Sequence, residues 1–182
     1  MEQQIAGGWW REAEACPSPN CNARPGPEDI SLLVLHNISL PPGEFGGEHV
    51  RALFCNQLDC SAHPWFEQLR DLRVSAHLLI DRHGKTTQFV PFTRCAWHAG
   101  ISNFRGRDNC NEFSIGIELE GTDDQSYTAS QYDSLARVSK AIMHAYPTIT
   151  RERIVGHSDI APGRKTDPGP AFDWKQYWSL LY

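Results

Sequence analysis

The sequence predicts a single α/β domain with a central mixed β-sheet flanked by helices, and three segments carry that prediction. Residues 31–36 (SLLVLH) are almost continuously apolar, residues 114–120 (SIGIELE) alternate, and residues 129–146 place apolar side chains at helical spacing. A continuous apolar run is typical of a strand that is buried on both faces. Strands interleaved with helices favour a sheet covered by helical layers.

The first half of the chain is predicted to add a helix and a hairpin to the strand at 31–36. Residues 76–80 and 86–90 are β-compatible runs on either side of DRHGK, which is a hairpin signal. A helix is expected near 47–57, with these side chains turned inward: Val50, Leu53 and Phe54.

The second half is predicted to contain two helices and two strands. The helix at 129–146 has a capping box in Thr128 and Gln131, and Pro147 ends it. Ile154 and Val155 form a short strand that leads into a loop, and a C-terminal helix starts near Asp173. The strand at 114–120 separates one face (Ile115, Ile117, Leu119) from the other (Gly116, Glu118, Glu120).

Length and composition bound the class of protein. The chain has 182 residues, and we expect one domain over 1–182 with its core at about 28–178. The net charge of -5 argues against a nucleic-acid partner, because proteins that bind nucleic acids usually carry a basic face. We find no signal peptide and no long apolar stretch, so we expect a cytoplasmic protein with no membrane partner. The six cysteines are then expected to be reduced thiols.

The segment 154–169 (IVGHSDIAPGRKTDPG) is the strongest candidate for a metal site. It places His157, Lys165 and Asp167 in a loop rich in turn residues, next to Asp159. Two histidines and one carboxylate make a zinc site with an open fourth position, as catalytic zinc sites have. His36 would supply the second histidine, although a lone histidine at the end of a buried strand is more often a core residue than a ligand.

An amide hydrolase also needs a proton-transferring group and a positive charge beside the oxyanion. Glu118 and Glu120 share one face of the same strand, and their spacing does not separate them. Lys165 is the candidate for the positive charge. A cysteine hydrolase built on Cys95 and His98 is an alternative that sequence proximity alone suggests.

Long motifs in order along the chain carry a resemblance to a known family. The runs LLVLHN, LRVSAHLLIDRHGKTTQFVP, AWHAG, NCNEFSIGIELEGT and GHSDIAPGRKTDPGPAFDW resemble the AmpD type of N-acetylmuramoyl-L-alanine amidase. More broadly the chain is similar to the amidase-2 superfamily, which includes peptidoglycan recognition proteins. The resemblance covers residues from about 8 to 178 and implies a mixed sheet flanked by helices.

The resemblance also implies the site and the reaction. It places zinc on His36, His157 and Asp167, the catalytic glutamate on Glu118 and the oxyanion lysine on Lys165. The implied reaction is hydrolysis of the amide between the lactyl group of a (1,6-anhydro)-N-acetylmuramic acid and L-alanine. This reaction belongs to cytoplasmic peptidoglycan recycling and lowers the muropeptide signal that induces β-lactamase. We expect a monomer whose partners are small anhydromuropeptides.

Substrate contacts are predicted less directly. Asn37 follows the first metal ligand, and Arg73 and His77 lie in the LRVSAH motif. Arg107 is the candidate for a stem-peptide carboxylate, although relatives carry that arginine closer to the cysteine, where this chain has Asn109. The rival function is a muropeptide-binding module without catalysis, which would lack a metal ligand.

Overall fold

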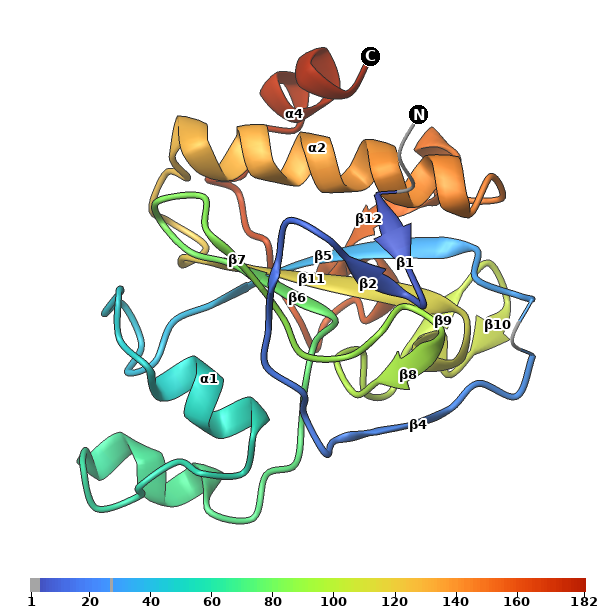
Figure 1. The fold of residues 1–182 in the computed structure, drawn as a ribbon. Coiled ribbons are helices and arrows are strands. Elements are labelled where there is room, and N and C mark those ends of the chain that lie inside the picture. Colours follow the sequence, from blue (N-terminus) through green and yellow to red (C-terminus); the bar gives the residue numbers. More distant parts are fainter. Residues whose placement is uncertain (1–3, 27) are drawn as a thin grey trace.

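A computed structural model describes residues 4–26 and 28–182 of the chain. Its main sheet has six strands in the order β12-β5-β11-β6-β7-β3 (Figure 1). The elements are β1 (Ile5–Ala6), β2 (Trp9–Trp10), β3 (Glu14–Ala15), β4 (Cys21–Ala23), β5 (Leu32–Ile38), α1 (His49–Phe54), η1 (Pro64–Leu69), β6 (Leu78–Ile80), β7 (Thr86–Gln88), β8 (Arg94–Ala96), β9 (Asn103–Phe104), β10 (Arg107–Asp108), η2 (Cys110–Glu112), β11 (Ser114–Glu120), α2 (Ala129–Ala145), η3 (Arg151–Arg153), β12 (Ile154–Gly156), α3 (His157–Ile160) and α4 (Trp174–Leu181).

The sheet is mixed, as predicted. β12, β5, β11 and β6 are parallel neighbours, and β7 pairs antiparallel with β6 in the expected hairpin. β3 then adds in parallel to β7 at the outer edge. The four parallel strands therefore bring their carboxyl ends to one edge of the sheet, where ligands of open α/β sheets commonly bind.

One face of the sheet packs under α2, and α4 lies outside α2 (Figure 1). α2 begins at the predicted capping box, in which the Thr128 hydroxyl accepts from the Gln131 N–H and the Gln131 side chain accepts from the Thr128 N–H. The buried apolar side chains of this layer belong to alternate positions of the strands: Leu33, Leu35, Leu78, Ile80, Ile115, Ile117 and Leu119. Tyr177 joins α4 to α2 through a hydrogen bond from its hydroxyl to Ser139 Oγ at 2.7 Å.

The other face of the sheet is also covered, so β11 is buried at all seven positions. Leu32 and Val34 pack there against Ala99, Cys110 and Phe113. The alternating pattern of 114–120 therefore separates an apolar face from a polar face that is equally shielded from water. A third cluster joins α1 and η1 to the hairpin, with Val50, Leu53 and Phe54 inward as predicted.

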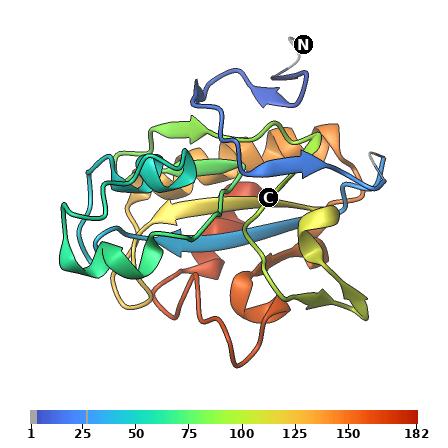
Figure 2. The ribbon, with the colours of Figure 1, turned by 90° about the horizontal axis from the view of Figure 1, so that it is seen from below.

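Within residues 4–26 and 28–182, no helix combines the length and the apolar character that crossing a membrane requires. The segment that carries α1 and η1 lies beyond the carboxyl ends of β5 and β11 (Figure 2). It borders that edge of the sheet directly, because the Gly46 N–H donates to Glu120 Oε1 at 2.6 Å.

Candidate active site

The carboxyl ends of β12, β5 and β11 place three polar side chains side by side. His36 lies near the end of β5 and is paired in register with Glu118 of β11. His157 follows β12 directly, one residue beyond the pair formed by Gly156 and Leu35. It begins the short helix α3, where the sequence predicted a loop. Parallel neighbours in register point to the same face, so the sheet itself brings these groups together.

His36, His157 and Asp167 form a compact cluster of ligand atoms. His36 Nδ1 and His157 Nδ1 are 3.0 Å apart, and Asp167 Oδ2 lies 3.1 Å from each of them. These three residues could hold a metal ion. Ligand atoms of a tetrahedral zinc ion with bonds of about 2.0–2.1 Å are roughly 3.3 Å apart, so the triangle fits a zinc ion with little adjustment.

Hydrogen bonds on the far side of each imidazole orient the cluster. His157 Nε2 lies 3.0 Å from Ala99 O, and His36 Nε2 lies 2.9 Å from His98 Nδ1. His98 Nε2 in turn lies 3.1 Å from Ser114 Oγ. A carbonyl only accepts, so we assign the Nε2–H tautomer to His157, which leaves its Nδ1 lone pair free to face a metal ion. At His36 a metal ion on Nδ1 requires the same tautomer, in which Nε2–H donates to His98 Nδ1 and His98 Nε2–H donates to Ser114 Oγ.

The protonation of the cluster suits metal binding. Burial lowers the pKa of His36 to about 4, so its imidazole is neutral near neutral pH. Burial alone would raise the pKa of Asp167, but its contacts with the His157 and His36 imidazoles hold that pKa well below its usual value. A neutral imidazole at His36 and an ionised carboxylate at Asp167 are the protonation states that a metal ion requires of these two ligands.

Glu118 is separated from Glu120 by its environment. Glu118 is buried, and its Oε2 has no hydrogen-bond partner among the described residues. Glu120 Oε1 accepts from the Gly46 N–H and its Oε2 from the Arg82 N–H, so both oxygens hold loops in place. A buried carboxylate oxygen without a partner is costly unless it has another role, so Glu118 is the better candidate of the two for a proton acceptor.

The charge around Glu118 supports this assignment. Burial and the neighbouring Asp167 raise the pKa of Glu118 well above its usual value. The positive charge of Lys165 acts in the opposite direction on the same carboxyl, which places Lys165 near the site although its side chain is exposed. Perturbed carboxyl groups of this kind are common at functional sites.

The predicted substrate contacts fall into different environments. Asn37 lies beside the cluster, and its side-chain amide donates to Asp123 Oδ1 at 2.8 Å and to Pro168 O at 3.2 Å. Arg73 is exposed and donates to the Arg70 and Leu72 carbonyls of its own turn.

Arg107 and His77 are engaged elsewhere in the structure. Arg107 forms an ion pair with Asp29 and lies over the Phe113 ring. The His77 side chain is fully buried. Its Nδ1 accepts from the Gly116 N–H and its Nε2–H donates to Arg94 O, each at 3.0 Å. His77 as placed therefore offers nothing to a substrate.

The cysteine-hydrolase alternative is wrong. The Cys95 thiol donates to Ala23 O, and burial raises its pKa, which disfavours the nucleophilic thiolate. His98 faces His36 and Ser114 instead of the thiol. Cys95 lies in β8 and His98 in the turn that follows it, so the two residues are close in sequence but their side chains serve different contacts.

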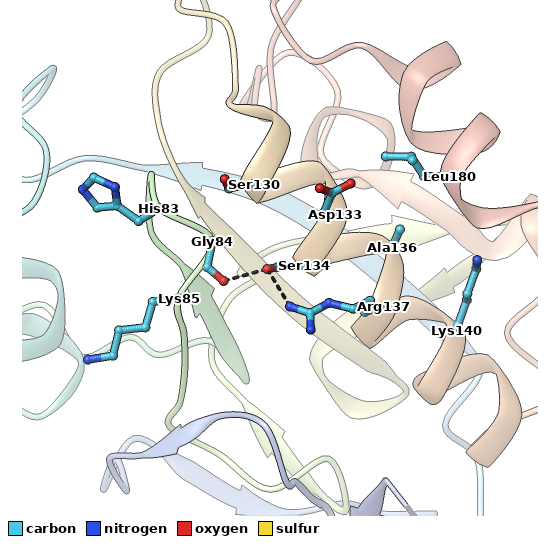
Figure 3. Close-up of a pocket in the computed structure, with 10 residues that line it drawn as sticks. All are labelled: His83, Gly84, Lys85, Ser130, Asp133, Ser134, Ala136, Arg137, Lys140 and Leu180. Atoms are coloured by element: carbon cyan, nitrogen blue, oxygen red, sulfur yellow. Dashed lines mark hydrogen bonds between the residues drawn. The ribbon is translucent and has the colours of Figure 1, made fainter.

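A groove of about 760 Å³ elsewhere on the molecule lies between the β6–β7 turn and α2 (Figure 3). The Ser134 hydroxyl donates to Gly84 O across it at 2.7 Å, and Arg137 donates to the same hydroxyl. None of the three clustered ligand residues lines this groove. The candidate chemistry therefore lies at the strand ends and not in this groove.

His98 is a positioning residue that the sequence did not reveal. We expect His98→Ala to weaken zinc affinity roughly 10–100-fold, because the His36 ring loses the hydrogen bond at Nε2 that orients it. Ser114→Ala, which removes only the last member of the chain, should cost less. Competition with a chromogenic chelator measures both affinities. Unchanged zinc affinity in His98→Ala would contradict this role.

The His98 ring leaves no room for a side chain at Gly116 of β11. A Cβ at Gly116 would lie 2.4 Å from His98 Cγ, so the imidazole packs directly on the backbone of β11. Gly116→Ala must displace His98, and it should reproduce the zinc defect of His98→Ala.

His77 makes stability depend on pH. Burial, together with the Arg24 charge, lowers its pKa to about 3, whereas an unfolded histidine has a pKa near 6.5. As the pH falls, His77 is therefore protonated in the unfolded chain before it is protonated in the folded one. The contribution of His77 to the free energy of unfolding is complete above pH 6.5 and decreases by up to about 1.4 kcal/mol per pH unit as the pH falls from 6.5 to 3. Urea unfolding of chelated protein from pH 6.5 to 4.5 should show a shallower slope for His77→Asn. Equal slopes would show that His77 does not titrate in this way.

The fold and the cluster define a mixed α/β protein in which three residues at the strand ends could hold a metal ion. A family model described as N-acetylmuramoyl-L-alanine amidase matches residues 26–170. The chain therefore belongs to the N-acetylmuramoyl-L-alanine amidase family and is an amidase.

Individual relatives and solved structures that the chain resembles are amidases of the same family. The chain is 56% identical over 174 residues to the 1,6-anhydro-N-acetylmuramyl-L-alanine amidase AmpD of Salmonella typhimurium strain SL1344, covering 96% of this chain and 92% of the relative. The crystal structure of a selenomethionine AmpD derivative has a TM-score of 0.95 at 54% identity, covering 98% of this chain and 99% of that one. AmpDh3 from Pseudomonas aeruginosa, in complex with anhydromuramic pentapeptide, has a TM-score of 0.64 at 32% identity, covering 86% and 61%.

Proposed function

We propose that this amidase hydrolyses the amide between the lactyl group of 1,6-anhydro-N-acetylmuramic acid and the L-alanine of the stem peptide. The observation that carries the proposal is the His36–His157–Asp167 triangle beside a buried carboxylate without a partner. The similarity to an AmpD over 96% of the chain supports the bond and the substrate class.

The proposed roles follow from the positions of the side chains. His36, His157 and Asp167 would hold zinc, which would supply a Lewis acid to activate water and polarise a carbonyl. Glu118 takes a proton from the attacking water and returns it to the leaving L-alanine nitrogen, which a carboxyl group of raised pKa can do near neutral pH. Lys165 places positive charge where the carbonyl oxygen becomes negative.

The substrate side of the site is proposed on less contact information. Asn37 lies beside the cluster, and its side-chain amide donates to Asp123 and Pro168, so its amide oxygen is the atom suited to a peptide N–H of the substrate. Arg73, being exposed, and Arg107, if it releases Asp29, remain candidates for stem-peptide carboxylates. We further propose a monomeric, single-domain enzyme over 1–182 that acts in cytoplasmic recycling and thereby lowers the muropeptide that induces β-lactamase.

The rival is a module that binds muropeptides without cleaving them. Incubation of the zinc-loaded protein with an anhydromuropeptide should release the intact stem peptide, and a chelator should stop the release until zinc is restored. Binding without release would support the module. Release of stem peptides from whole sacculi, at a rate similar to that from the soluble fragment, would instead indicate an enzyme of the intact wall.

A further inference from the structure

Two cysteines outside the active site lie in contact. Cys16 follows β3 directly, Cys55 follows α1 directly, and their Sγ atoms are 3.5 Å apart. Both are free thiols with partial solvent exposure. A disulfide needs an S–S distance of about 2.05 Å, so side-chain rotation of the order of 1.5 Å at the sulfurs would close the bond.

Hydrogen bonds that do not involve sulfur hold the two segments together. The Ser18 hydroxyl donates to Phe54 O at 2.5 Å. The side-chain amides of Asn20 and Asn56 donate to each other's oxygen, each at 2.9 Å. The sulfur atoms are therefore placed side by side by the surrounding structure, which removes most of the entropic cost of bringing them together.

The two sulfurs have different surroundings. The Arg51 Nε–H donates to Cys16 Sγ at 3.1 Å, so a cation faces this sulfur. Burial, with a smaller contribution from the contact with Cys16, raises the pKa of Cys55. Because the thiolate is the attacking form of cysteine, and Arg51 gives a thiolate at Cys16 a partner, Cys16 is the attacking sulfur and Cys55 the resolving one.

The other four cysteines are differently placed. The Cys21 thiol donates to Ser18 O and the Cys60 thiol to Leu58 O. Cys95 and Cys110 are buried. Among the contacts of the described residues, the Cys16–Cys55 pair is the one that joins two sulfurs.

We propose that Cys16 and Cys55 form a reversible redox site that a hydroperoxide oxidises to a disulfide. Cys16 Sγ attacks one peroxide oxygen, the O–O bond breaks, and the product is a sulfenic acid at Cys16 and hydroxide, which takes the thiol proton. Cys55 Sγ then attacks Cys16 Sγ, the S–O bond breaks, and the Cys55 proton leaves with the hydroxyl as water. Two thiols and one hydrogen peroxide thus give one disulfide and two water molecules, and a dithiol such as dithiothreitol reverses the change.

The test is peroxide treatment of the full chain followed by intact mass and peptide mapping. We expect the loss of two hydrogen atoms, a cross-linked peptide pair containing Cys16 and Cys55, and reversal by dithiothreitol. Cys21→Ser/Cys60→Ser should cross-link at the same rate. Cys55→Ser should accumulate a sulfenic acid at Cys16 that dimedone traps, whereas Cys16→Ser should trap little dimedone. Cross-linking through other cysteines, or dimedone labelling chiefly at Cys55, would overturn the proposal.

Arg51 is a positioning residue in this account, and its role has a matched control. Arg51 and Lys85 both pair with Glu14, but only Arg51 donates to Cys16. We expect Arg51→Gln to slow formation of the sulfenic acid at Cys16 at least several-fold, with a shallower dependence of the rate on pH. Lys85→Gln should leave the rate unchanged. Equal rates for the two variants would show that the guanidinium does not assist the attack.

Discussion

Glu118→Gln should bind zinc normally and lose amide hydrolysis by a factor of roughly 100 or more. The amide keeps the size of the side chain but cannot accept the proton of the attacking water. Glu118 Oε2 has no hydrogen-bond partner to lose among residues 4–26 and 28–182, so the variant should fold as the native chain does. The measurement pairs zinc content with the rate of L-alanine-peptide release from an anhydromuropeptide.

Glu120→Gln is the matched control for this change. Glu120 lies two residues further along the same face of β11, but both of its oxygens accept hydrogen bonds from loop N–H groups. Its replacement should cost about 1 kcal/mol of stability, because one of these bonds is lost, and should leave turnover close to normal. Near-normal turnover in Glu118→Gln, or equal losses in both variants, would contradict the assignment.

Asp167→Ala should weaken zinc binding by more than roughly 100-fold. Loss of a residue that only hydrogen-bonds to a metal ligand costs about 10–100-fold in affinity, and loss of a ligand itself should cost more. The carboxylate is the only negative group of the triangle, and its Oδ2 lies 3.1 Å from both Nδ1 atoms. Its loss leaves two ligands, which is fewer than a catalytic zinc site uses. Chelator competition gives the affinity, and hydrolysis should fall with zinc occupancy.

Asp159→Asn controls for a change of charge in the same segment. Asp159 Oδ2 accepts from the Gly156 N–H at 2.7 Å and so caps α3, which the amide oxygen of asparagine can continue to do. Zinc affinity should stay within a few-fold of the native value. If Asp167→Ala bound zinc as tightly as Asp159→Asn, Asp167 would not be a ligand.

The sequence predicted the parts of the fold whose signal lies in consecutive residues. The strand at β5, the β6–β7 hairpin, the strand β11 and the helix α2 with its capping box are confirmed, because each shows a continuous apolar run, a turn between two β-compatible runs, an alternation or a helical repeat. The short strands near the N-terminus, such as β1, β2 and β3, have two residues each. A segment of that length shows no period, so its pairing depends on distant residues that local patterns do not report.

The site was predictable only in part for the same reason. Spacing did not distinguish Glu118 from Glu120, whereas their hydrogen-bond partners among the described residues separate them. The partner of His98 is His36, 62 positions away in the chain, so the sequence offered its neighbour Cys95 instead. The long motifs shared with the amidase family were needed to select the residues in advance of the structure.

The most direct test of the account is a crystal structure of the zinc-loaded protein with anomalous scattering recorded at the zinc edge. One strong peak should lie within about 2.0–2.2 Å of His36 Nδ1, His157 Nδ1 and an Asp167 oxygen, with Glu118 nearby and not bound to the metal. A peak at Nε2 of either histidine, at the cysteines or at Glu118 would contradict the metal centre on which the proposed function depends.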